Sequence, residues 1–315
     1  MGKRSRVKAR SQAAAPAGEV GPRQPCPCGS GRRYKNCHGS ASGPVQTFVA
    51  RPFEGLPSEC DVIALRELVP SATAPLPLRD DVGTDRSVVL CSLLPMAAPA
   101  LVRQDGTVWL GLQVQHSYGD PSRDLAAVLE EALDAEAGAV VGLTAPPGEG
   151  RRLQDLVADE PLEVTVHDGF DFWVADVDDP GGSVAASLEN ANAAANPTVR
   201  LGSVEAAYWT NVGTKEHLRW VMPYEEESLL TALARLHAAG QDSLAEGSRL
   251  VGTFRAHGLL VPVWDLPVGT GAEVLEQPAA RLAEQLDAAL ADDSPLSPEE
   301  RSARSGLANR QLTLR

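Results

Sequence analysis

Residues 206–240, AAYWTNVGTKEHLRWVMPYEEESLLTALARLHAAG, contain the pattern that decides the fold class. Two apolar runs rich in aromatic and β-branched residues flank Gly213-Thr214, which predicts a β-hairpin. Pro223 then leads into a segment with leucines at helical spacing, and Gly240 ends it. A hairpin followed by an amphipathic helix predicts an α+β fold in which helices pack on one face of a sheet.

The same order of elements occurs earlier, over residues 101–138. Asp105-Gly106 predicts a hairpin there, and Pro121 opens a helix that Gly138 ends. The repetition suggests a duplicated ββα unit, but few residues are identical between the two segments, so both readings stay open. The other expected elements are a strand at 87–94, hairpins joining 162–167 to 170–177 and 250–255 to 259–264, and helices at 183–195 and after Pro278.

A second informative stretch, PCPCGSGRRYKNCHG, occupies residues 25–39. Three thiols and one imidazole within 13 residues form the type of four-ligand set that holds a structural Zn²⁺ tetrahedrally. So short a segment cannot bury enough apolar surface to fold alone, and a bound metal would organise it. The expected zinc ligands are Cys26, Cys28, Cys37 and His38.

The residues between the ligands suit a compact bead with a basic surface. Gly29 and Gly31 allow the backbone to curl toward the sulfur atoms, and Tyr34 supplies the one sizeable apolar contact. The basic side chains of this stretch are expected to face solvent. We therefore expect partner contacts from Arg32, Arg33, Tyr34 and Lys35.

Over residues 22–40 the chain resembles the SEC-C motif, the zinc-binding segment at the C-terminus of the SecA preprotein-translocase ATPase. The resemblance implies that the three cysteines and His38 bind zinc. It also implies docking of a macromolecule, because in SecA this segment is implicated in binding the SecB chaperone, and ribosome and anionic-lipid contacts have been proposed. The motif is N-terminal here, and no Gly-x-x-x-x-Gly-Lys-Ser/Thr loop follows, so translocase activity does not carry over. The remaining chain resembles uncharacterised actinobacterial proteins with this motif, which implies no activity.

Charge separates the start of the chain from the rest. Residues 1–38 contain nine Lys and Arg against Glu19 alone, a net charge of +8, whereas the remainder carries −22. A basic arm of this density commonly contacts phosphates or an acidic protein surface, although it can also serve only solubility. The expected parts are a disordered basic tail (1–24), a zinc knuckle (25–40), a linker (41–52), an acidic α+β domain (53–292) and a tail with a short, poorly anchored helix (293–315).

The remaining cysteines give no disulfide framework. Zinc would take three of the five, and Cys60 and Cys91 are far apart in the sequence. This usage fits a reducing cytoplasm. The N-terminus lacks a signal-peptide core, and no apolar run approaches the roughly 18–20 residues that span a membrane.

The acidic domain offers few groups for catalysis. His116 precedes Asp120 and Asp124 at a strand-to-helix turn, where an acid–base pair could act, but a helix cap and a surface histidine explain these residues more simply. The acidic run at 168–179 lacks calcium-loop spacing and is explained by turns. Other polar groups that we considered lack ligand spacing or a nucleotide-binding context: Glu216-His217, His257 and Gly269-Thr270-Gly271. The five tryptophans all fall in expected strands and are expected to pack in the core.

These observations favour a non-enzymatic, zinc-binding adapter or interaction protein whose basic head (residues 1–38) docks a protein partner. One alternative is a protein that binds RNA or the ribosome through phosphate contacts from the head. Another is an enzyme with a site in the α+β domain, built around His116 and the carboxylates of 168–179.

Overall fold

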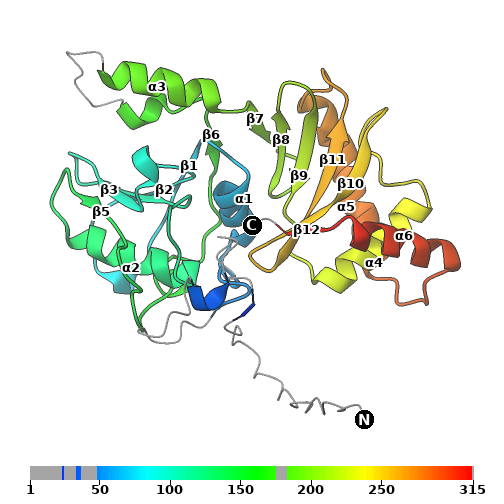
Figure 1. The fold of residues 1–315 in the computed structure, drawn as a ribbon, viewed down its shortest axis with the longest axis horizontal. Helices are drawn as coiled ribbons and strands as arrows, with labels where there is room; N and C mark the ends of the chain where they lie inside the picture. Colours follow the sequence, from blue (N-terminus) through cyan, green and yellow to red (C-terminus); the bar gives the residue numbers. More distant parts are fainter. Residues whose placement is uncertain (1–22, 25–32, 37–47, 175–182, 314–315) are drawn as a thin grey trace, which may run out of the picture.

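The structure, a computed structural model, describes residues 23–24, 33–36, 48–174 and 183–313. Within these residues the chain forms two six-stranded sheets and six α-helices (Figure 1). The expected α+β class is confirmed. None of the described helices is long and apolar enough to cross a membrane.

The first sheet has the strand order β5-β3-β4-β2-β1-β6. Its strands are β1 (Ala72–Pro75), β2 (Val88–Cys91), β3 (Ala100–Val102), β4 (Val108–Gly111), β5 (Val140–Val141) and β6 (Thr165–Val166). β2 and β4 are parallel, and the other neighbours are antiparallel. One face packs against α2 (Pro121–Asp134), which begins as expected because the Asp120 side chain accepts a hydrogen bond from Arg123 N and Pro121 occupies the first turn.

The second sheet has the order β12-β10-β11-β9-β8-β7. Its strands are β7 (Thr198–Arg200), β8 (Ala207–Asn211), β9 (Glu216–Trp220), β10 (Arg249–Ala256), β11 (Leu259–Leu266) and β12 (Leu312–Thr313). Only the β10–β12 pair is parallel. One face packs against α4 (Glu226–Ala238), α5 (Glu276–Leu290) and α6 (Pro298–Asn309), with Trp264 fully buried beneath them.

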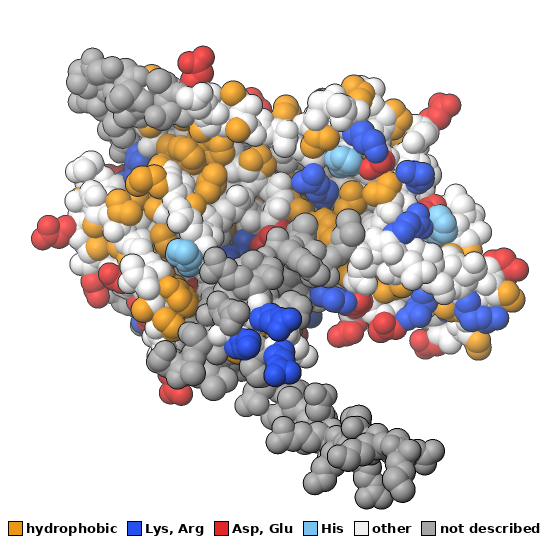
Figure 2. All heavy atoms as spheres, in the orientation of Figure 1, with side chains coloured by type: hydrophobic (Ala, Val, Ile, Leu, Met, Phe, Trp, Pro, Cys, Tyr) orange, Lys and Arg blue, Asp and Glu red, His pale blue; other side chains and the backbone are white. Residues whose placement is uncertain are grey.

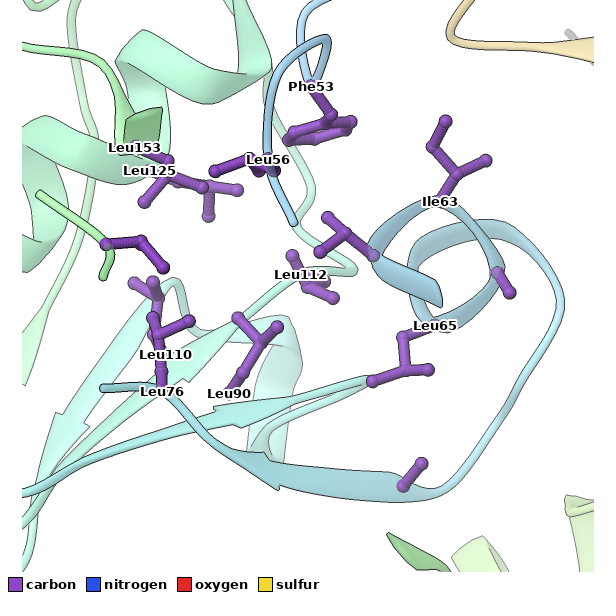
Figure 3. Packing of buried hydrophobic residues seen from close by; sticks show 14 of the residues in the cluster. Phe53, Leu56, Ile63, Leu65, Leu76, Leu90, Leu110, Leu112, Leu125 and Leu153 are labelled. Carbon is purple, nitrogen blue, oxygen red and sulfur yellow. The ribbon is translucent and has the colours of Figure 1, made fainter. Parts of the chain in front are cut away.

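Helix α1 (Glu59–Glu67) lies between the two sheets (Figure 1). Seven of its nine residues are buried, so it has no solvent-facing stripe along most of its length. Ile63 and Leu65 share one apolar cluster with Leu90 of the first sheet and Val261 of the second. Figure 3 shows the part of this cluster that joins α1 to the first sheet. The second sheet is therefore covered on both faces, which corrects the expectation that helices pack on one face only.

A buried carboxylate joins α1 to the second sheet. Arg200 donates from Nε and Nη2 to the two oxygens of Asp61 at 3.1 and 3.0 Å, and the Tyr208 hydroxyl donates to Asp61 Oδ1 at 2.6 Å. Asp61 is 2% exposed. Burial, together with the charge of Asp61, raises the pKa of Tyr208, which keeps the hydroxyl protonated as a donor. Asp61 and its two donor residues thus satisfy one another's hydrogen-bonding groups in the interior.

Two further contacts hold the ends of α1. Arg51 donates from Nε and Nη2 to the Glu59 carboxylate at 2.7 Å each, and His257 Nε2 lies 2.7 Å from Glu67 Oε1. His257 and Gly258 form the turn between β10 and β11, as expected. Gly258 has φ +88°, and a Cβ atom there would lie 2.8 Å from Arg51 Cβ. The turn therefore requires glycine, because Ala50 and Arg51, which precede the α+β domain (the body of the protein), pass directly against it.

Two expectations for individual elements were wrong. The hairpin joining 162–167 to 170–177 is absent from the described residues: β6 spans only Thr165–Val166, and a 3-10 helix, η5 (Asp171–Val174), follows. The C-terminal helix α6 is well anchored, because it packs on α4, Leu307 is fully buried in the apolar cluster, and β12 then joins the second sheet. A capping box at Ser297 and Glu300 begins α6 as its sequence indicates.

Both expected ββα units form, as β3-β4-α2 and β8-β9-α4. Their surroundings differ, because β4 pairs in parallel with β2 whereas β9 pairs antiparallel with β11. The duplication therefore stays a prediction. The remaining helix, α3 (Ser183–Ala194), follows η5 and precedes β7.

Replacing Tyr208 by Phe tests the buried contact with Asp61. We expect the free energy of unfolding to fall by about 1.5–3 kcal/mol, because a hydrogen bond to a charged group is lost in the interior. Tyr224→Phe is the matched control, since the Tyr224 hydroxyl donates to Asp287 at 3.0 Å in an exposed position, and its expected cost is within about 0.5 kcal/mol. Urea unfolding monitored by circular dichroism measures both. Equal costs for the two variants would contradict the assigned role of Asp61.

Candidate functional site

The four expected zinc ligands, Cys26, Cys28, Cys37 and His38, lie outside the described residues, as does Arg32. The described part of this segment is Arg33 and a 3-10 helix, η1 (Tyr34–Asn36). Tyr34 N donates to Gln24 O at 2.8 Å, so these two described residues are in contact. Tyr34 is 8% exposed, whereas Arg33 and Lys35 are exposed.

Buried and exposed side chains alternate at Arg33, Tyr34 and Lys35, which gives the tyrosine and the two cations different roles. The Tyr34 ring packs inward, which suits the apolar contact expected of it. Arg33 and Lys35 present their charges to solvent, where a partner can reach them. Tyr34 is thus buried between two exposed cations.

The chemistry of the donor set fits zinc. Three cysteines and a histidine are the ligand types of closed structural zinc sites. The two cysteines of the α+β domain, Cys60 and Cys91, are not expected to compete for the metal ion, because both are buried. Burial raises the pKa of each thiol, to about 12 for Cys91, which disfavours the thiolate that a metal requires. In the part of the chain that the structure describes, no group of three or more His, Cys, Asp or Glu side chains could hold a metal ion.

His116 is exposed, and the two carboxylates expected near it are occupied by other groups. Asp120 caps α2 and pairs with Arg152 Nε at 2.9 Å. Asp124 accepts hydrogen bonds from Tyr118 N at 2.7 Å and from the Ser117 hydroxyl at 2.9 Å. Burial raises the pKa of Asp124 despite these bonds. The carboxylates therefore order the turn before α2.

His167 lies in a different part of the surface from His116. Its Nε2 is 2.8 Å from the Thr73 hydroxyl, and its ring stacks on Phe172 with centroids 4.6 Å apart. Burial lowers the pKa of His167. It borders an open hollow with Asp168 and Asp171, whereas His116 borders another with Arg66 and Asp124. The acidic residues at 176, 178 and 179 lie outside the described residues.

The Gly269-Thr270-Gly271 segment has a structural role that its sequence did not reveal. Gly269 N and Gly271 N donate to the two oxygens of Glu216 at 2.6 and 2.9 Å, and Trp209 Nε1 donates to the same carboxylate at 2.8 Å. Both glycines have positive φ, at +90° and +73°. Successive amides in such a loop form an anion-binding concavity, which here holds a carboxylate of the same chain.

The tryptophans divide into two groups. Trp220 and Trp264 are buried in the core, as expected. Trp109, Trp173 and Trp209 are only partly buried, and Trp173 lies in η5 instead of a strand. Trp173 Nε1 donates to Leu93 O at 3.1 Å, which holds η5 across the outer face of the first sheet.

The comparisons with known proteins divide the chain between residues 40 and 52, close to the point where the sign of its net charge changes. The SEC-C motif matches residues 23–40, and the family described as "Family of unknown function (DUF5926)" matches residues 52–315. The protein translocase subunit SecA of Aromatoleum aromaticum (strain DSM 19018 / LMG 30748 / EbN1) is 64% identical over 33 residues, which are 10% of this chain and 4% of SecA. The chain thus shares only a short segment with SecA. No solved structure matches it. The resemblance to the SEC-C motif is confirmed.

Replacing Glu216 by Gln tests the carboxylate in the Gly-Thr-Gly loop. Burial acts to raise the pKa of Glu216, but the amides of Gly271 and Gly269 outweigh it and hold this pKa below its ordinary value. The resulting stabilisation is complete above the ordinary glutamate pKa of about 4.3 and is lost as the pH falls through the lower folded value. We expect Glu216→Gln to cost about 1.5–3 kcal/mol at pH 7.

Urea unfolding of wild type and Glu216→Gln between pH 7 and pH 3 measures this difference, which should shrink below about pH 4. Glu276→Gln is the control, because the Glu276 carboxylate accepts from Gly202 N and Ser203 N but is less buried than Glu216, and it should show a smaller effect. A difference between wild type and Glu216→Gln that is independent of pH would count against this interpretation.

Proposed function

Because the chain belongs to the DUF5926 family and carries a SEC-C motif ahead of that domain, we propose that it is a zinc-binding adapter whose basic head docks a protein partner. One observation carries the proposal: the motif at residues 23–40 presents exposed Arg33 and Lys35 beside a buried Tyr34. Segments of this kind are short enough to be carried by unrelated proteins, so the docking role is proposed for the head and the translocase activity of SecA is not.

The proposed metal site consists of the Cys26, Cys28 and Cys37 thiolates and the His38 imidazole. Zinc bound there would supply the folding free energy that so short a segment lacks. The protein's own residues would then act as the docking surface. Tyr34 would pack within the zinc-bound segment, and the neighbouring basic side chains would face the partner.

The charge distribution favours an acidic partner surface. Basic side chains gather at the lower centre of Figure 2, near the darkest blue segment of Figure 1. The remainder of the chain carries −22 and would repel an acidic protein. The head is therefore the part to which an acidic surface is attracted, and the DUF5926 domain would bind a second partner or set the distance between partners.

RNA or ribosome binding by the same head is the second candidate, and the +8 charge of residues 1–38 favours it. Phosphate contacts release counterions, so such binding weakens steeply as salt rises. Tyr34 is the only aromatic residue of the motif and is buried, which leaves no stacking surface for base recognition among its described residues. An enzymatic site receives no support from the described residues, because His116 and His167 border separate hollows.

Metal analysis of the purified chain tests the head directly. We expect about one zinc ion per chain by mass spectrometry, because the motif offers one complete tetrahedral ligand set. Replacing Cys26 and Cys28 by Ser should reduce bound zinc to background. Cys60→Ser is the matched control and should keep the full zinc content, since that thiol is buried in the body. Zinc that persists in the double variant would contradict the assignment.

A cross-linking pull-down followed by mass spectrometry tests docking. Reversing the charges of Arg33 and Lys35 to Glu should reduce recovery of the partner about tenfold or more, because it removes two exposed cations from the proposed contact. The same change at Arg249 and Arg281, both exposed on the body, controls for net charge. Equal recovery with both double variants would contradict docking through the head. RNA in the recovered material, released between roughly 50 and 200 mM salt, would favour the second candidate.

A further inference from the structure

The face of the second sheet that lies opposite α4 and α5 carries a row of charged side chains. Along β9, Leu218 and Trp220 point into the core under these helices, so His217 and Arg219 point to the other face. The register places Arg219 between Tyr208 of β8 and Val263 of β11. Arg200 of β7 is the next residue of the same row, beyond Tyr208. Figure 2 shows basic side chains and a histidine gathered over the upper part of this sheet.

Two other cations of this face have carboxylate partners, and Arg249, opposite Asp265 in the register, is exposed to water. Arg200 pairs with Asp61 at 3.0 Å, and Lys215 pairs with Asp265 at 2.7 Å. The Asp265 carboxylate also lies 3.0 Å from His217 Nδ1. In the described chain no carboxylate pairs with Arg219 and no acceptor receives a hydrogen bond from it. Arg219 is therefore a partly buried cation of this face that has no counterion among the described residues.

The lack of a counterion for Arg219 is unusual for two reasons. Arg219 is only partly exposed, and a charge that is drawn away from water without a counterion lowers stability. Burial accordingly lowers the pKa of Arg219, and no neighbouring acid offsets the effect. In addition, residues 39–315 carry a large excess of negative charge, so unpaired carboxylates are plentiful in this part of the chain, yet none is placed against Arg219.

We propose that Arg219 binds an oxyanion of a small ligand, a phosphate or carboxylate group, on this face of the second sheet. The planar guanidinium presents a fork of N–H donors that matches two oxygens of such a group. Arg200 stands in the same row with its own fork held by Asp61, which shows how this face already accommodates an arginine–carboxylate pair. The ligand would supply to Arg219 the counterion that the chain supplies to Arg200.

The neighbouring His217 provides a local reporter. Burial lowers the pKa of His217, Asp265 raises it, and the charges of Arg219 and Lys215 lower it. An oxyanion on Arg219 would offset one of the lowering charges. The pKa of His217 should therefore rise when the site is filled, which a nuclear magnetic resonance titration of the imidazole protons would detect.

The test compares the full chain with Arg219→Met, Arg219→Lys and Arg281→Met, using inorganic phosphate as probe and acetate as the singly charged comparison. All solutions are balanced with chloride to one ionic strength. The wild type should show a saturable rise in its thermal midpoint and in the pKa of His217. Arg219→Met should bind phosphate at least tenfold more weakly, and Arg219→Lys should retain part of the affinity because it keeps the charge. Arg281→Met, which removes an exposed cation elsewhere, should match the wild type.

Without phosphate, Arg219→Met should unfold at the same temperature as the wild type or a higher one, because an unpaired charge has been removed. A lower midpoint for this variant would instead indicate a structural role for Arg219. No saturable phosphate effect in the wild type, or an equal effect in Arg219→Met, would overturn the proposal. A stronger response to acetate than to phosphate would assign the site to carboxylates.

Discussion

The buried carboxylate of Asp61 is the interaction on which the arrangement of the body depends. It lies on α1, and its donors, Arg200 and Tyr208, lie on β7 and β8 of the second sheet. A buried charge that loses one of its partners costs several kcal/mol, so the helix and this sheet edge cannot separate without a large penalty. Because α1 also packs on the first sheet through Ile63 and Leu65, the same helix fixes both sheets.

This arrangement determines where binding can occur. The face of the second sheet beneath α4, α5 and α6 is filled with apolar side chains, and α1 covers part of the other face. His217 and Arg219 lie on that same face. The SEC-C segment precedes all of these elements in the sequence. Arg51 lies between it and α1 and pairs with Glu59 of that helix.

Local signals predicted much of the fold. Turn residues identified the β3–β4, β8–β9 and β10–β11 hairpins, and Asp120-Pro121 identified the start of α2. Asp168-Gly169 wrongly predicted a hairpin, because contacts with distant residues override its turn propensity. The Ser71 hydroxyl donates to Gly169 O, and the Asn192 side chain accepts from Phe170 N. Contacts between distant residues had no local signal. Asp61 lies 139 residues from Arg200, and the partner of the Gly269–Gly271 amides could not be inferred from the loop itself.

The assignment of Cys26, Cys28, Cys37 and His38 as zinc ligands stays a prediction, which rests on residue type and spacing. The central claim is that this head is a separate, zinc-organised element joined to a body that α1 holds together. Amide hydrogen exchange of the full chain, with and without a zinc chelator, measures it most directly. We predict that chelation removes protection only from peptides within residues 23–40, while peptides from α1 and β8 keep theirs. Loss of protection that spreads through α1 and the sheets, or no change within residues 23–40, would contradict the claim.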